Sequence, residues 1–279
     1  MNAVRTELGA VPRPRLGSAR AVVVLGWREG RRMLTGPVYL VIVGGLFLSF
    51  GVSALDLTAV SRSDVRDVLV RVLTYGALAT LFASSLVATS ARRTGAESQF
   101  GAAPLDPQLR TLATGLGVLL GPTSVASALT LGVAYAENGP GPPHEPSFSD
   151  WEYLHLPLTW LGAGLLGLAV ARWLPWPGVP LAVFVGLVAW TMWSAHLMFN
   201  GRWGGFLMPY VIASQDVVGL GTSSPDGHPG WHAVYLLGLC LLALAAALLR
   251  HRPLRERAML GFGVLAAVLT ASAAWLQLP

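Results

Sequence analysis

The chain has 279 residues, of which 53% are hydrophobic and only 12% charged, and its mean hydropathy is +0.57. Soluble domains carry about a quarter charged residues, so this composition predicts a polytopic membrane protein. All 19 basic residues are arginine, and a chain without lysine has neither a phosphate-binding P-loop of its own nor a Schiff-base amine.

Residues 1–37 form a basic segment, with seven arginines against two glutamates, that we expect to stay in the cytoplasm. A helical wheel over Ser18–Leu34 separates a basic sector from a mostly apolar one. The basic sector contains Arg20, Arg28, Arg31 and Arg32, and the opposite side Val22, Val23, Trp27, Met33 and Leu34. This predicts an amphipathic helix in the inner headgroup layer, ended by Gly36-Pro37. A disordered basic tail is the alternative, and it suits residues 1–17 better.

The remainder, residues 38–279, reads as one transmembrane domain. A helix needs about 20 apolar residues to cross a bilayer core, and the chain offers six to seven such runs. The predicted spans cover residues 38–55, 72–91, 111–136, 154–171, 179–199, 231–249 and 258–276. The Ala, Ser and Thr content of the last run, 258–276, lowers its hydrophobicity. The sequence therefore predicts an all-α transmembrane helical bundle.

Individual spans carry small residues that indicate helix packing. Gly117-x-x-x-Gly121 in the third run permits close helix approach, and Pro122 beside it is expected to kink the helix. Cys240, the only cysteine, lies in an apolar run and is expected to be a small buried or lipid-facing residue. A lone cysteine also excludes an intrachain disulfide and a cysteine metal cluster.

The distribution of arginine predicts which side of the membrane each connecting segment faces. Placing the N-terminus inside assigns 15 arginines to inner segments and 4 to outer ones, as the positive-inside bias requires. Three connections are then outside: the charge-balanced 56–71, the acidic and proline-rich 137–153, and 200–230. Within the last, residues 203–209 are apolar but too short to span, so we expect an interfacial or re-entrant element. The predicted location is the cytoplasmic (inner or plasma) membrane.

A polar island, residues 92–110, separates the second and third spans. It contains three arginines, two prolines and two glycines, so we expect a short, broken loop on the cytoplasmic side. A compact loop of this kind offers a surface on which a soluble partner can push.

Little in the sequence indicates chemistry. The central parts of the spans lack charged residues, which argues against a proton-coupled transporter or a charged channel filter. Their serines are expected to serve helix packing: Ser84, Ser85, Ser124, Ser127 and Ser194. His228 and His232 are four apart, but Pro229-Gly230 opposes a helix between them, so we expect no metal site. His155 and His196 are expected to be interfacial hydrogen bonders. Hydrolase motifs are absent from the sequence.

The layout of residues 18–130 resembles the membrane permease subunit of type-2 ATP-binding-cassette exporters. In that family an amphipathic connecting helix with an R-E-x-x-R-like stretch precedes the first span, and here the match is Arg28-Glu29-Gly30-Arg31-Arg32. A short coupling helix then lies between the second and third spans, ending in a proline and an arginine. The corresponding residues are Arg92, Arg93, Glu97, Pro104 and Arg110. The family also places a surface or re-entrant helix before its last common span, where residues 203–216 lie.

Two features depart from the family pattern. Its core usually has six spans, so the seventh run is an addition, and residues 98–102 are more polar and glycine-rich than a good coupling helix. The resemblance implies a permease without catalytic residues or cofactors that pairs with a cassette ATPase subunit and with a second permease copy or paralogue in the lipid bilayer. We expect no nucleic-acid partner, and an amphiphilic or apolar substrate.

Two other classes of function stay open at this stage. A non-transporting membrane scaffold or accessory protein would act without any ATPase. A membrane-embedded enzyme would depend on a single polar residue such as His155 or His196.

Overall fold

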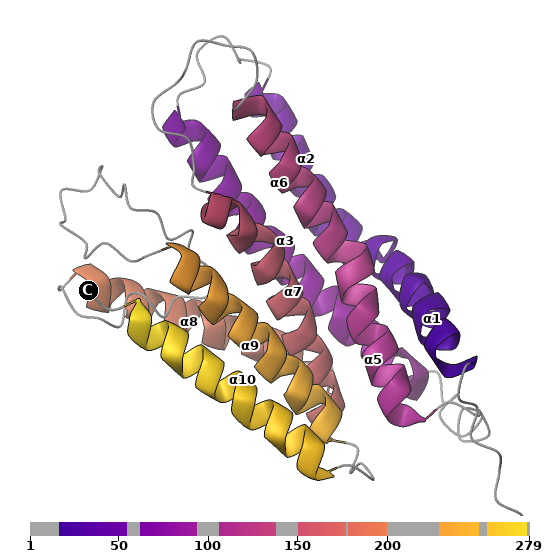
Figure 1. Ribbon diagram of the computed structural model, residues 1–279. Helices are drawn as coiled ribbons and strands as arrows, with labels where there is room; N and C mark the ends of the chain where they lie inside the picture. The colour runs from indigo at the N-terminus through magenta and orange to yellow at the C-terminus, as the bar shows by residue number, and fades with distance from the viewer. Residues whose placement is uncertain are drawn as a thin grey trace, which may run out of the picture.

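A computed structural model places most of the chain in helices (Figure 1). It describes residues 17–54, 62–93, 106–137, 150–176, 178–199, 229–250 and 256–277. Those ranges contain eight helical segments and no strand, because α5, the π-helical turn η2 and α6 follow one another without a break. The predicted all-α fold is confirmed.

The helix bounds follow the apolar runs closely. They are α1 Gly17–Leu34, α2 Pro37–Ala54, α3 Arg62–Arg93, α5 Pro107–Val118, η2 Leu119–Thr123, α6 Ser124–Glu137, α7 Asp150–Trp173, α8 Val179–Phe199, α9 Pro229–Leu249 and α10 Glu256–Leu276. The α3 helix begins ten residues before the predicted span and includes charged residues of the expected outer loop. Pro229 and Gly230 begin α9 rather than preventing a helix there, since proline is tolerated in a first turn.

Within the described residues, five helices are long and apolar enough to cross a membrane. They contain Arg71–Ser90, Pro107–Tyr135, Asp150–Trp173, Pro229–Leu249 and Arg257–Leu276. The chain is thus a multi-pass membrane protein by helix length and hydropathy. The two other predicted spans also form helices, α2 without a charged residue and α8 with a shorter apolar part, Val179–Ser194. That they cross the bilayer, and that the N-terminus lies inside, stay predictions.

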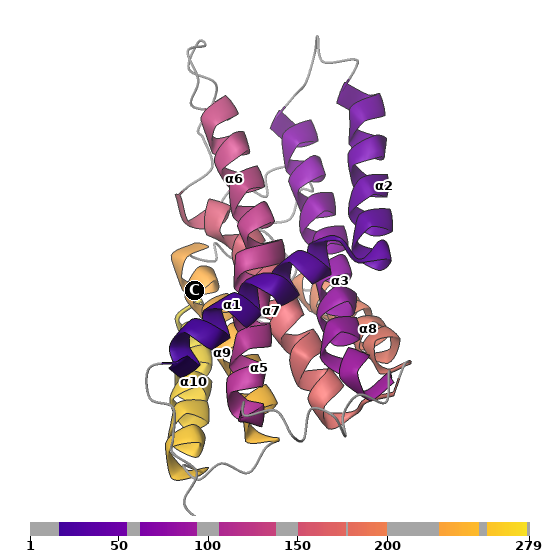
Figure 2. The same cartoon turned by 90° about the vertical axis from the view of Figure 1, so that its right-hand side faces the viewer.

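The α7 helix is the centre of the bundle, with α3 on one side and α9 on the other (Figures 1 and 2). The α10 helix packs on α9, and α2 packs on α3. Trp160 of α7 is fully buried and meets Tyr39 of α2 edge-on, with ring centroids 6.5 Å apart. A β-carbon added to Gly76 of α3 would lie 1.7 Å from this indole, so only glycine leaves room for it.

Small residues also set the other close contacts, as is usual where helices pack within a bilayer. The Ser85 hydroxyl donates to the carbonyl oxygen of Gly167 at 2.9 Å and joins α3 to α7. Cys240 is buried, and its Sγ donates to the carbonyl oxygen of Leu158 at 3.4 Å. The expected packing role is confirmed for Ser85 and for Ser84, which is fully buried and lies against Gly167, whereas the hydroxyls of Ser124 and Ser127 donate to carbonyls of the preceding turn.

Candidate functional site

The α1 helix ends where the sequence predicts it. Its last turn contains Arg31 and Arg32, whose charge complements the partial negative charge of a helix C-terminus. The next residues form an elbow into α2, in which the amide of Thr35 donates to the carbonyl oxygen of Arg31 at 3.0 Å. Pro37 begins α2, and the amide of Leu40 donates to the carbonyl oxygen of Gly36 at 3.0 Å.

The face that α1 packs against the bundle is one that the helical wheel did not single out. The wheel placed Val23 and Trp27 on the apolar side, away from the arginines, and these side chains are 54% and 61% exposed, which agrees with a helix whose apolar side faces the headgroup layer. The residues buried against the bundle are Gly26, Gly30 and Met33, at the i, i+4, i+7 spacing of one helix face. The helix therefore presents glycine to the bundle and its valines, tryptophan and arginines to the surroundings.

Two glycine pairs hold α1 against the third apolar run, and we call Gly26, Gly30, Gly117 and Gly121 the glycine clamp. A β-carbon on Gly30 would lie 2.6 Å from the carbonyl oxygen of Gly117, and one on Gly121 would lie 2.7 Å from that of Gly30. Both pairs have the small-x-x-x-small spacing that lets backbones approach closely. The predicted packing role of Gly117 and Gly121 is confirmed, and its partner is α1.

The clamp coincides with a backbone irregularity. Pro122 lies inside the π-helical turn Leu119–Thr123, which joins α5 to α6 without ending the helix. Proline lacks an amide hydrogen and its ring collides with the preceding turn, and one π-helical turn relieves both problems. Pro122 is thus accommodated by a π-helical turn, which belongs to the continuous α5–η2–α6 helix that α1 crosses (Figure 2).

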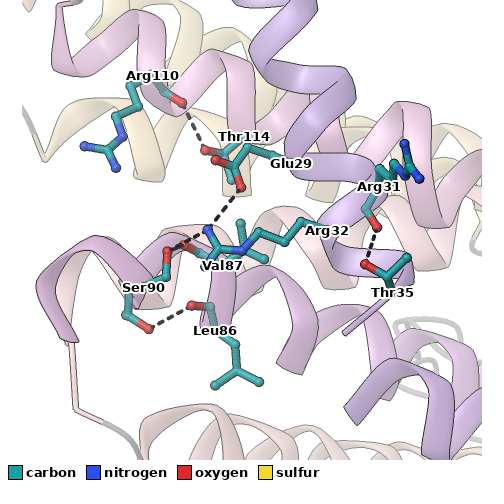
Figure 3. A network of polar contacts seen from close by, with 10 residues as sticks. Glu29, Arg31, Arg32, Thr35, Leu86, Val87, Ser90, Arg110 and Thr114 are labelled. Carbon is teal, nitrogen blue, oxygen red and sulfur yellow. Dashed lines mark hydrogen bonds and ion pairs between the residues drawn. The ribbon is translucent and has the colours of Figure 1, made fainter. Parts of the chain in front are cut away.

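A polar network completes the contact between α1 and the bundle (Figure 3). Arg32 Nη1 donates to Ser90 Oγ of α3 at 3.2 Å and lies 3.9 Å from Glu29 Oε2, too far for a hydrogen bond but within ion-pair range. On α5, the Thr114 hydroxyl donates to the carbonyl oxygen of Arg110 at 3.0 Å. The end of α1 therefore contacts α3 one turn before Arg93, and its glycine face contacts α5.

The predicted island is shorter than expected. Arg92 and Arg93 form the last turn of α3, and Arg110 belongs to the first turn of α5. The α5 helix begins there because Asp106 caps it, its carboxylate accepting from the amide of Gln108 at 3.0 Å, and because Pro107 suits a first turn. The segment between the helices is residues 94–105, which contains Glu97 and Pro104, and both lie outside the described residues.

The structure unites only some of the predicted site residues. Glu29 and Arg32 meet in the network, whereas Arg28 and Arg31 are exposed on α1 and Arg110 is partly buried on α5. The side chains of Arg92 and Arg93 lie outside the described part, as do residues 1–16, the proposed surface element at 203–216 and His228. The described residues contain no group of three metal-binding side chains.

The structure contains a buried pair of histidines that the sequence did not predict. His155 of α7 and His232 of α9 are fully or almost fully buried, with ring centroids 4.9 Å apart. His155 is thus a hydrogen bonder, as expected, but its partner lies within the bundle, and its place at the membrane interface stays a prediction. The Gln277 side-chain amide donates to the carbonyl oxygen of Ala273, which leaves its Oε1 as the acceptor for His232 Nδ1 at 3.0 Å. His155 Nε2 meets the carbonyl oxygen of Pro229 at 3.1 Å. The pair joins α7, α9 and the end of α10.

Compared with known proteins, the chain matches no family model, and no curated protein or solved structure is similar to it at a significant level.

Proposed function

We propose that this multi-pass membrane protein is the permease subunit of an ATP-binding-cassette exporter of the type-2 class, which moves an amphiphilic substrate across the cytoplasmic membrane. A separate cassette ATPase supplies the energy, and a second permease copy or a paralogue completes the path. This division of labour agrees with a sequence that has no lysine for a P-loop.

The main support for the proposal is that α1 contacts both helices adjacent to residues 94–105, namely α3 before the segment and α5 after it. Its Arg32 contacts Ser90 at the end of α3, and its Gly30 lies against Gly117 in α5. A force applied to residues 94–105 acts on the ends of α3 and α5, and it is passed to α1 through these contacts. Rigid-body tilting of packed helices is a known way in which a force applied at one site opens a substrate path elsewhere in a bundle.

The charges near the segment favour an acidic partner. Arg92, Arg93 and Arg110 flank the segment in the sequence, and Arg28 and Arg31 are exposed on α1. Guanidinium groups beside a docking segment suit an acidic surface on a soluble partner, because opposite charges steer association.

Purification from the native host in a mild detergent tests the proposal most simply. We expect a protein with a P-loop to copurify and its ATP hydrolysis to depend on the permease. Replacing Arg93 and Glu97 together by alanine should uncouple hydrolysis from transport while leaving membrane insertion intact. The matched control is Arg20→Ala, an exposed arginine at the start of α1.

Three outcomes would overturn the proposal. Function without any copurifying ATPase would indicate a scaffold or accessory protein. Loss of activity from a single polar substitution at His155 or His196 would indicate a membrane-embedded enzyme. Wild-type coupling of ATP hydrolysis to transport in the double variant would show that residues 93 and 97 do not transmit force from the ATPase.

A further inference from the structure

The elbow between α1 and α2 encloses an open recess of about 300 Å³. Its walls come from the end of α1, from the elbow Thr35-Gly36-Pro37, and from Ala83, Leu86 and Val87 of α3. This is the lower end of the size range for small-molecule sites, which begins near 300 Å³. The recess can therefore hold a headgroup and the first part of an attached chain, but not a whole lipid.

The recess is apolar inside and cationic at its rim. Met33, Val38 and Leu86 give the recess apolar walls. Arg32 lies at its rim, and the side chain of this arginine is 55% exposed. Both contacts of that guanidinium within the described residues are made through Nη1, to Ser90 and to Glu29. A guanidinium has five N–H donors in a rigid fork, so the remaining donors can take a phosphate while Ser90 fixes the group in place.

The surrounding charge favours an anion. Arg28, Arg31 and Arg32 stand in the last two turns of α1 against a single carboxylate, Glu29. Glu29 lies 3.9 Å from Arg32 and so offsets part of one charge, which leaves this end of the helix basic. Surface arginines near a bilayer attract anionic lipids by about 1 kcal/mol each.

Tyr39 belongs to the wall of the same recess. The residue is 4% exposed and its hydroxyl oxygen is buried, so it contributes an apolar wall and not an accessible donor.

We propose that the elbow recess binds one anionic phospholipid of the surrounding bilayer. Its phosphate meets Arg32 at the rim, its glycerol region lies against the apolar walls, and its chains leave along the apolar surface of α2, where Leu40 and Val41 are 57% and 73% exposed. The apolar walls and the lipid-exposed start of α2 select a lipid over a soluble phosphate. The inference requires only the bilayer and stands independently of the proposed ATPase.

Native mass spectrometry of the full chain released from detergent micelles tests the site. The probes are phosphatidylglycerol, phosphatidylcholine and glycerol 3-phosphate, each added at matched concentration. We expect wild-type protein to retain one phosphatidylglycerol in clear preference to phosphatidylcholine, and Arg32→Gln to weaken that retention about tenfold, as the loss of a charge-assisted hydrogen bond predicts. The same substitution at Arg20, exposed at the other end of α1, should leave retention unchanged.

A second variant separates the recess from general surface charge. Val38→Phe fills the recess without changing charge, and it should abolish retention while the protein keeps the thermal melting midpoint of wild type. The proposal fails if wild type retains both lipids equally, if Arg20→Gln weakens retention as much as Arg32→Gln, or if Val38→Phe retains phosphatidylglycerol normally. Displacement of the lipid by an equal concentration of glycerol 3-phosphate would instead assign a soluble anion to the site, and would also overturn it.

Discussion

Replacing Gly30 by alanine is expected to loosen α1 from the bundle. The added β-carbon would lie 2.6 Å from the carbonyl oxygen of Gly117, whereas ordinary van der Waals contact begins at 3.4 Å. The obstacle is backbone, which cannot rotate away as a side chain can, so the two helices must separate by about 0.8 Å. Overpacking of this kind costs about 1–3 kcal/mol, which corresponds to a roughly 5- to 150-fold rise in the undocked fraction of α1.

Hydrogen–deuterium exchange of the protein in lipid nanodiscs measures that fraction. Packing against the bundle protects the amides of α1, so peptides from residues 17–34 should exchange faster when Gly30→Ala raises the undocked fraction. Gly132→Ala is the matched control, because it makes the same change in α6 with no atom within 4 Å of the new β-carbon. Equal α1 exchange in wild type, Gly30→Ala and Gly132→Ala would refute the clamp.

Three further substitutions probe contacts elsewhere in the fold. Asp106→Ala removes the cap of α5 and is expected to cost about 1 kcal/mol, seen as faster amide exchange confined to the first turn of that helix. His232→Leu leaves the Oε1 acceptor of Gln277 buried without its donor, and we expect a lower melting midpoint from a loss of about 1–3 kcal/mol. Gly76→Ala places a β-carbon 1.7 Å from Trp160 and should abolish the monodisperse peak in size-exclusion chromatography, while Trp160→Phe in the same chain should partly restore it.

Each of these substitutions has a control of the same chemistry. Asp106→Ser keeps a capping oxygen and should exchange like wild type. His196→Leu changes an exposed histidine on α8, and Gly186→Ala adds a β-carbon with no atom within 4 Å. Exchange in Asp106→Ala that matches Asp106→Ser would contradict the capping role. A His232→Leu midpoint no lower than that of His196→Leu, or a normal elution profile for Gly76→Ala, would contradict the packing described for α7.

The sequence predicted the helices well because hydrophobic runs are a local signal. Every predicted span is helical, and α8 has the predicted bounds, 179–199. The predicted second span, 72–91, agrees with the apolar part of α3, Arg71–Ser90, but the helix itself is longer because charged residues continue it at both ends, from Arg62 and to Arg93. The start of α5 was readable in principle, since Asp106-Pro107 is a capping signal, but hydropathy alone does not detect it.

Contacts between segments far apart in the chain were harder to predict from the sequence. Gly117-x-x-x-Gly121 was recognisable as a packing motif, and Gly26-x-x-x-Gly30 has the same spacing, but one sequence does not say which motif faces which. The partners His155 and His232 lie in different helices, so no local pattern joins them. Their burial depends on three helices converging, which only the three-dimensional arrangement reveals.

The most direct test of the proposed function is photo-crosslinking from position 97 in membranes of the native host. A photoreactive amino acid replaces Glu97, between the ends of α3 and α5, and a control chain carries it at position 226 in the predicted outer connection. We expect position 97 to form a covalent adduct with a protein that mass spectrometry identifies as a P-loop ATPase, and position 226 to form none. Absence of any ATPase adduct from position 97, or the same adduct from position 226, would contradict docking of a motor on this segment.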